Sequence, residues 1–188
     1  MGRQFIGTIL SLNKTRAVFC CLPGIFPGGI VTKTALRVTA GLFFMEDGMY
    51  YLKTEQSFDS AHFLKGYQGK CSNIHGHRWR VVVEIKAREL SDHPQTRGMV
   101  VDFGDLKAAL KEICDHLDHC LIYESGSLRP GTLLALEEEG FRLVELPFRP
   151  TAEHLARHIS QLMKAQGYEV DRVEVYETPN NCAVYGED

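Results

Sequence analysis

The sequence contains no long hydrophobic run and no strong excess of charge. No stretch approaches the roughly 18 consecutive apolar residues that a membrane-spanning helix needs, so we expect no membrane partner. The net charge at pH 7 is only −3, which gives no general reason to expect nucleic-acid binding. The six cysteines form no C-x-x-C pair, and we expect a reduced, cytoplasmic protein. The 188 residues contain no internal repeat and suit one domain with a sizeable core.

Residues 1–44 lack acidic residues altogether. They contain five basic residues, several glycines and prolines, and no sustained hydrophobic period. A transit peptide has a similar composition, but clear strand patterning begins only at Tyr50. We therefore expect residues 1–44 to be a basic, disordered extension, or to precede a true start near Met45 or Met49. The functional domain is expected at residues 45–188.

Hydrophobic periodicity predicts two strands, two long helices and two further strands. Alternation is clearest where Trp79, Val81, Val83 and Ile85 share one face, and both helices have apolar residues at helical spacing. Residues 121–149 are less regular, with a short helix expected at 132–139. The order ββααββ predicts an α+β fold, with two helices on one face of an antiparallel four-stranded sheet. Joining several such sheets into an oligomeric barrel would remove their exposed edges. The predicted elements span residues 50–58, 78–88, 102–118, 151–166, 171–178 and 183–185.

Three histidines carry the strongest chemical signal. His75 and His77 are two residues apart, so on an extended strand both side chains point to one side. With His62 they make a three-nitrogen set that suits a zinc ion with an open fourth position. Cys71, four residues before His75, is then a candidate base or nucleophile. Each residue also has an ordinary interpretation, a hydrogen-bonded histidine or an inert buried thiol.

Four other residues are candidates with competing explanations. Asp118 and His119 close the first helix, where a charged or imidazole group is common for dipole reasons alone. Glu177 shares the period-two face of apolar strand residues, so it is either a rim residue or a ligand anchor. Glu153 lies in the first turn of the second helix, behind the N-cap candidate Thr151, where its charge complements the helix dipole.

Six short segments, in this order, resemble the 6-pyruvoyl-tetrahydropterin synthase / 6-carboxy-tetrahydropterin synthase family. They run from about residue 50 to the C-terminus, while residues 1–44 have no counterpart. The resemblance is weakest at 121–149, which is longer than in compact members. The segments are residues 58–62 (FDSAH), 71–77 (CSNIHGH), 101–107 (VDFGDLK), 117–119 (LDH), 150–153 (PTAE) and 176–178 (YET).

The resemblance implies a tunnelling fold, in which trimers close a β-barrel and two trimers stack as a homohexamer. It implies Zn²⁺ as cofactor on the three histidines and Cys71 as the catalytic thiolate. Asp118 and His119 become its proton-relay partners, contributed by a neighbouring subunit. Glu177 would anchor the pterin ring, and Thr151 and Glu153 would help line the pocket.

The resemblance also implies a substrate, 7,8-dihydroneopterin triphosphate. Three residues separate Cys71 from His75, a spacing that resembles the carboxy-type enzymes of queuosine (7-deazaguanine) biosynthesis, whereas animal pyruvoyl synthases have a longer insertion. The expected products are 6-carboxy-5,6,7,8-tetrahydropterin, acetaldehyde and triphosphate. The alternatives are a pyruvoyl synthase or related pterin side-chain lyase, a zinc hydrolase, and a non-catalytic zinc-stabilised assembly module. Candidates for neutralising the triphosphate are Lys65, Lys70, Arg78 and Arg80.

Overall fold

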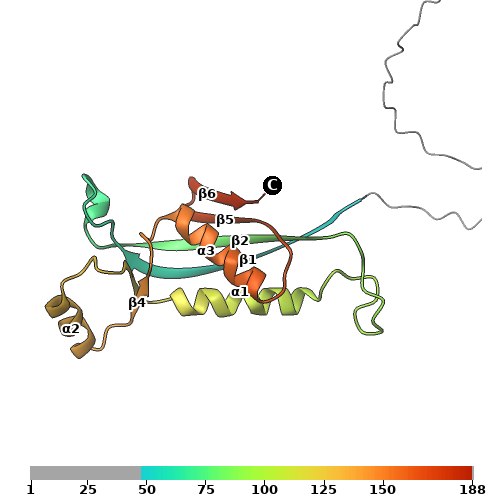
Figure 1. Cartoon of the computed structure of the whole chain (residues 1–188), viewed down its shortest axis with the longest axis horizontal. Helices are drawn as coiled ribbons and strands as arrows, with labels where there is room; N and C mark the ends of the chain where they lie inside the picture. The colour runs from blue at the N-terminus through green and yellow to red at the C-terminus, as the bar shows by residue number, and fades with distance from the viewer. Residues whose placement is uncertain (1–47, 188) are drawn as a thin grey trace, which may run out of the picture. The chain divides into compact units, whose positions relative to one another are not determined.

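The structure of this protein is a computed structural model, which describes residues 48–187 (Figure 1). The predictions for residues 1–44 lie outside this range. Among residues 48–187, no helix is both long enough and apolar enough to cross a membrane.

Four strands form the antiparallel part of a mixed sheet. β1 (Tyr50–His62) and β2 (His75–Ala87) pair along their whole length, with His62 opposite His75. β5 (Val170–Thr178) pairs with β2, and β6 (Asn181–Gly186) pairs with β5. These are the four strands that the alternating pattern predicts. β1 and β2 are longer than predicted, because each continues into the histidine motifs.

Two further strands correct the predicted topology. β3 (Leu121–Glu124) pairs in parallel with β1, and β4 (Leu143–Leu146) pairs in parallel with β3. The sheet therefore has six strands in the order β4-β3-β1-β2-β5-β6, and the prediction of a four-stranded, purely antiparallel ββααββ sheet is wrong. A strand of four residues is too short for its alternation of apolar and polar residues to be recognised in the sequence. Between them lies α2 (Pro130–Glu138), close to the short helix expected at 132–139.

The two long helices begin where capping residues predict. α1 (Phe103–Leu117) starts after Asp102, whose side-chain Oδ1 accepts a hydrogen bond from the Gly104 N–H at 2.6 Å. α3 (Ala152–Ala165) starts after Thr151, whose hydroxyl accepts from the third N–H of the helix. Each cap satisfies a backbone donor that has no partner inside its helix, which fixes where the helix begins.

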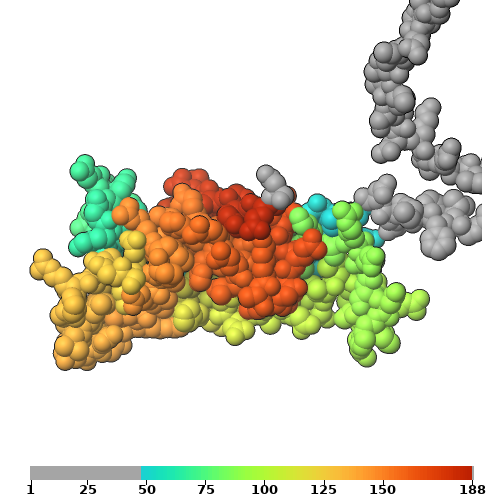
Figure 2. Space-filling view, viewed as in Figure 1, coloured from blue at the N-terminus to red at the C-terminus, as the bar shows by residue number. Residues whose placement is uncertain are grey.

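The two faces of the sheet differ in character. Alternate residues of β1, β2 and β5, such as Phe58, Trp79 and Val175, pack against apolar residues of α1 and α3 in one core. In Figure 2 the orange atoms of the α3 region lie in front of the middle of the sheet, and the yellow-green atoms of the α1 region lie along the lower edge. The opposite face is charged: the buried carboxylate of Glu84 lies 3.0 Å from Lys53 Nζ and 2.9 Å from Arg172 Nε. The prediction that both long helices pack on one face is confirmed by these core contacts.

Candidate metal centre and active site

The three predicted histidines lie together at one end of the β1–β2 hairpin. The ring centroids of His62 and His75 are 4.5 Å apart, and His77 lies 5.2 Å from His62 and 4.9 Å from His75. One ligand atom from each ring and one from the Glu177 carboxylate all lie within 4.8 Å of one another. The register of β1 on β2 causes this arrangement, because it places His62 directly opposite His75.

Main-chain carbonyl groups orient two of the rings. His62 Nδ1 lies 2.8 Å from the Pro150 carbonyl oxygen, and His75 Nδ1 lies 2.8 Å from that of Asn73. A carbonyl oxygen only accepts, so each Nδ1 carries the hydrogen and donates it. In the neutral ring, the lone pair is then on Nε2. Metal-binding histidines are oriented in the same way by partners of their second nitrogen.

The Nε2 atoms of all three rings are buried without a hydrogen-bond partner. A buried polar atom without a partner is costly, and three such atoms facing one point require an explanation. A cation bound between them would satisfy all three, and imidazole nitrogens with one carboxylate suit zinc and other divalent transition metals. The residues present therefore fit a metal ion.

Burial favours the uncharged imidazole in this cluster. His62 is 1% exposed, and its burial lowers its pKa below the ordinary value of 6.5. Burial also lowers the pKa of His77, although the Glu177 carboxylate opposes the change. Neutral rings are the form that binds metal, so burial prepares the site for a cation.

Glu177 reaches this cluster from β5. Its Oε1 lies 3.4 Å from His62 Nε2 and 3.3 Å from His77 Nε2. Glu177 therefore lies beside the histidine cluster, and its role as a ligand anchor stays a prediction. A carboxylate placed here can complete the metal ligands or accept hydrogen bonds from a bound molecule.

Trp79 supports the histidines from the core, a role that the sequence did not single out. Its ring is fully buried, with its centroid 5.0 Å from that of His62 and 5.4 Å from that of His77. The period-two spacing of His75, His77 and Trp79 could have indicated this contact. The carbonyl groups of Pro150 and Asn73 could not have been found in that way, because every residue type carries one.

A cavity of about 280 Å³ adjoins the metal cluster. Its walls include Cys71, Thr151 and Glu153 together with His62 and Glu177. The structure therefore brings the predicted thiol and the predicted pocket residues to one place. Three segments supply them: the loop before β2, the start of α3 and the end of β5. The sequence did not single out the remaining wall residues: Leu64, Tyr67, Ala152, Asn181, Cys182 and Ala183.

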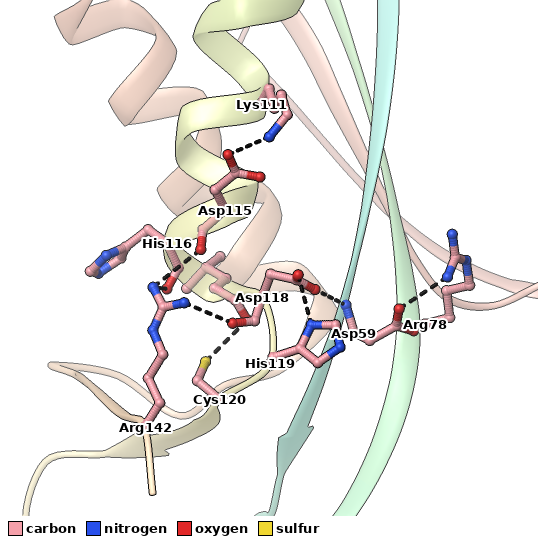
Figure 3. A network of polar contacts seen from close by, with 10 residues as sticks. Asp59, Arg78, Lys111, Asp115, His116, Asp118, His119, Cys120 and Arg142 are labelled. Atoms are coloured by element: carbon pink, nitrogen blue, oxygen red, sulfur yellow. Dashed lines mark hydrogen bonds and ion pairs between the residues drawn. The ribbon is translucent and has the colours of Figure 1, made fainter. Parts of the chain in front are cut away.

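Asp118 and His119 lie in the turn between α1 and β3, held against β1 (Figure 3). Asp118 Oδ1 accepts a hydrogen bond from the Asp59 N–H at 2.7 Å, and Asp118 Oδ2 lies 2.7 Å from His119 Nδ1. The His119 N–H donates to the Asp59 carbonyl oxygen at 2.7 Å. The Asp59 N–H is the main cause that lowers the pKa of Asp118, so its carboxylate stays charged and orients the imidazole.

This pair faces a different hollow from the one beside Cys71. His119 lines a groove of about 730 Å³ together with Asp59, Arg78 and His77, the last of which also belongs to the histidine cluster. Apolar residues from the loop before β2 and from the α2–β4 segment complete the groove, and they include Ile74 and Phe141. Within one chain, the structure does not place the Asp118–His119 pair in the cavity that Cys71 lines.

The arginines proposed for the triphosphate have other partners. Arg78 lies 3.0 Å from the Asp59 carboxylate, and Arg80 lies 3.1 Å from Glu55, over the ring of Tyr176. Lys65 lies in an exposed turn and Lys70 begins the short 3-10 helix η1 (Lys70–Ser72), and their neighbours Leu64 and Cys71 line the cavity.

Comparison with known proteins finds relatives with similar sequences over most of this chain. The protein named 6-carboxy-5,6,7,8-tetrahydropterin synthase in Haemophilus influenzae is 36% identical over 142 residues, covering 74% of this chain and 100% of that protein. A protein of the same name in Synechocystis is 33% identical over 139 residues, covering 73% and 93%.

Solved structures share the fold. An uncharacterized protein of Wolinella succinogenes matches with a TM-score of 0.63 at 24% identity, covering 74% of this chain and 99% of that one. The 6-pyruvoyltetrahydropterin synthase of Plasmodium vivax matches with a TM-score of 0.54 at 20% identity, covering 76% and 99%.

A family model described as 6-pyruvoyl tetrahydropterin synthase matches residues 51–188, which include all six of the segments that carried the resemblance. The two relatives from Haemophilus influenzae and Synechocystis are covered over 100% and 93% of their length. The chain therefore belongs to the 6-pyruvoyl tetrahydropterin synthase family of pterin lyases, and the prediction that it is an enzyme of this family is confirmed.

Proposed function

We propose that this protein is a zinc-dependent 6-carboxy-5,6,7,8-tetrahydropterin synthase. It would convert 7,8-dihydroneopterin triphosphate and water to 6-carboxy-5,6,7,8-tetrahydropterin, acetaldehyde and triphosphate. One observation carries the proposal: Cys71, Glu177 and His62 line one cavity, and His75 and His77 complete the metal-competent cluster to which His62 and Glu177 belong. The names of the relatives and the three-residue spacing between Cys71 and His75 favour the carboxy product. A carboxy-type enzyme would belong to queuosine biosynthesis, in the cytoplasm.

The cavity would bind the pterin ring rather than the whole substrate. Its volume of about 280 Å³ is small for a ligand pocket, which typically measures about 300–1,000 Å³. Glu177 would accept hydrogen bonds from ring N–H groups, and Thr151 and Glu153 would line the ring's other side. The triphosphate would extend outwards to Lys65 and Lys70, whose ammonium groups bind phosphate as point charges.

His62, His75 and His77 would hold the zinc ion through Nε2. A zinc ion bound there would act as a Lewis acid on the side-chain hydroxyl groups of the substrate, which makes the neighbouring protons easier to remove.

Cys71 would remove a proton from the substrate side chain, as the base on the cavity wall. The Asp118–His119 pair would return and redistribute protons: the Asp118 carboxylate fixes the ring through Nδ1, which leaves Nε2 free to exchange a proton.

The pair would reach the cavity of a neighbouring subunit. His119 has an exposed side chain, and the groove beside it has apolar walls formed by residues such as Ile74 and Phe141, themselves 60% and 62% exposed. A second copy seated on this groove would bury these residues and bring His119 to another chain's site. Repetition of this contact in a hexamer of two trimers would also pair the free edges of the sheet.

Product analysis tests the reaction. Purified protein is incubated with 7,8-dihydroneopterin triphosphate, and the products are identified by mass. We expect 6-carboxy-tetrahydropterin together with acetaldehyde. A pyruvoyl product without acetaldehyde would make the protein a pyruvoyl synthase instead. An unchanged substrate in the presence of bound zinc would refute the lyase proposal and favour a zinc-stabilised assembly module.

Complementation tests the shared site. Cys71→Ala and His119→Asn proteins are each expected to lose most, but not all, of the activity. When unfolded together and reassembled in equal amounts, about a quarter of the sites in a random mixture would receive both intact residues, one from each chain. Recovery near that level supports a shared site, and no recovery with correct assembly contradicts it.

A further inference from the structure

Arg142, the residue before β4, contacts the end of α1 (Figure 3). Its Nη1 donates to the carbonyl oxygen of Asp118 at 3.0 Å, and its Nη2 donates to those of Asp115 at 3.1 Å and His116 at 3.0 Å. The last carbonyl groups of a helix have no partner within the helix, and a planar guanidinium can bond several of them at once. All three acceptors lie at or just before Asp118.

The main chain of Arg142 holds the other side of the same turn. Its carbonyl oxygen accepts from the N–H of Leu121, the first residue of β3, at 2.9 Å. One residue thus binds the chain both before and after His119. Between these two attachments His119 adopts a φ of 51°, in the left-handed region that residues with a Cβ rarely occupy.

The strained turn sets the direction of the His119 ring. From the other side, the main chain of Asp59 on β1 bonds both Asp118 and His119 at 2.7 Å. If the end of α1 were released, the Asp118 carboxylate would move with it, and the 2.7 Å contact with His119 Nδ1 would be lost. Arg142 therefore acts on the imidazole without touching it.

We propose that Arg142 is a positioning residue for the Asp118–His119 pair, an inference that rests on the lyase reaction proposed above. It belongs to the α2–β4 segment, which carries none of the motifs that define the resemblance. Its guanidinium fixes the last turn of α1, so that the Asp118 carboxylate keeps its contact with His119 Nδ1. A lysine could not replace it fully, because one ammonium cannot bond three carbonyl groups in this fork geometry.

Kinetics of Arg142→Gln and Arg142→Lys provide the first test, with Lys111→Gln as matched control. Lys111 is a second cation on α1, and its ion-pair partner is the Asp115 carboxylate rather than Asp118 or His119. We expect kcat to fall about tenfold in Arg142→Gln with KM nearly unchanged, and Arg142→Lys to recover part of the loss. The control should keep wild-type kcat. An unchanged kcat in Arg142→Gln would overturn the proposal.

A double-mutant cycle separates positioning from general stability. In a His119→Asn background, Arg142→Gln should lower the residual kcat less than twofold, because the group it positions is already gone. An equal tenfold loss in both backgrounds would mean that Arg142 acts independently of His119, which contradicts the proposal.

The tautomer of His119 gives a readout that needs no turnover. In the wild type, Asp118 keeps the hydrogen on Nδ1, and long-range ¹H–¹⁵N spectra distinguish this form from the Nε2–H form. Arg142→Gln should shift the population towards Nε2–H, while Lys111→Gln should not. If the wild type converts no pterin substrate, the proposed function fails, but this measurement still decides the role of Arg142. An unchanged tautomer in Arg142→Gln would refute it.

Discussion

Replacing His75 should remove most of the stabilisation that zinc gives this protein. His75 is the most suitable of the three histidines for this test, because it is only partly buried, whereas His62 is in the core. His75→Ala deletes one of the three unpartnered Nε2 atoms and also the hydrogen bond to the Asn73 carbonyl oxygen. His93→Ala is the matched control, since His93 is an exposed loop histidine outside the metal cluster.

The size of the effect follows from mass action. Zinc at 100 times its Kd stabilises the folded protein by about 2.7 kcal/mol, which for a domain of this size raises the Tm by about 5–10 °C. Loss of a residue that hydrogen-bonds a metal ligand lowers the metal affinity about 10–100-fold. Loss of the ligand itself should lower the zinc affinity at least as much. At the same zinc concentration, a 100-fold weaker site gives about 0.4 kcal/mol, or about 1 °C.

The assay is thermal unfolding of chelator-treated protein with and without added zinc, together with metal content measured by mass spectrometry. Wild type and His93→Ala should show the full rise in Tm and bind one zinc ion per chain. His75→Ala should show almost no rise in Tm on addition of zinc. An equal rise in His75→Ala and wild type would mean that zinc binds elsewhere, and the three-histidine site would be refuted.

Three further outcomes are expected. Cys71→Ala should keep zinc and change the Tm by no more than a few degrees, yet lose at least about 100-fold in kcat, because it removes the proposed base; near-normal turnover would exclude the thiol from the chemistry. Glu177→Gln should keep zinc and raise KM more than about tenfold, as a residue that binds the ring would; loss of zinc would identify Glu177 as a metal ligand instead. The metal-free protein should lose stability as the pH falls below 6.5, since folding lowers the pKa of His62 and His77 and the unfolded chain then binds more protons. Denaturant unfolding at pH 7 and 5.5 measures this loss; a smaller loss in His77→Gln would support the reasoning, and a free energy of unfolding that is equal at both pH values would contradict it.

The histidine cluster could be predicted because strand alternation is local. The spacing of His75, His77 and Trp79 places their side chains on one face without knowledge of any partner strand. The same alternation placed Glu177 on the face of Val173 and Val175, and its contact with His62 agrees with that face. Only the register between distant strands, which the sequence does not state, brings these residues to one point.

The sequence predictions were wrong or incomplete where the structure depends on pairing between segments that are far apart in the sequence. β3 and β4 have four residues each, and they are strands because they pair in parallel with β1 and with each other. The roles of Pro150 and Asn73 rest on carbonyl groups, which no side-chain pattern reveals. Arg142 is similar: its contacts with α1 depend on how β4 pairs with β3, so it looks like an ordinary surface cation in the sequence.

The two halves of the proposed site attach to β1 at different places. The His62 side chain points to the helix side, where it joins the metal cluster and the cavity lined by Cys71. The main chain of Asp59, three residues earlier, holds Asp118 and His119 beside the groove that His119 lines. This groove and the cavity lined by Cys71 have no wall residue in common. A second chain would bring both groups to one substrate, so the reassembly of Cys71→Ala with His119→Asn tests the proposed chemistry and the proposed assembly together.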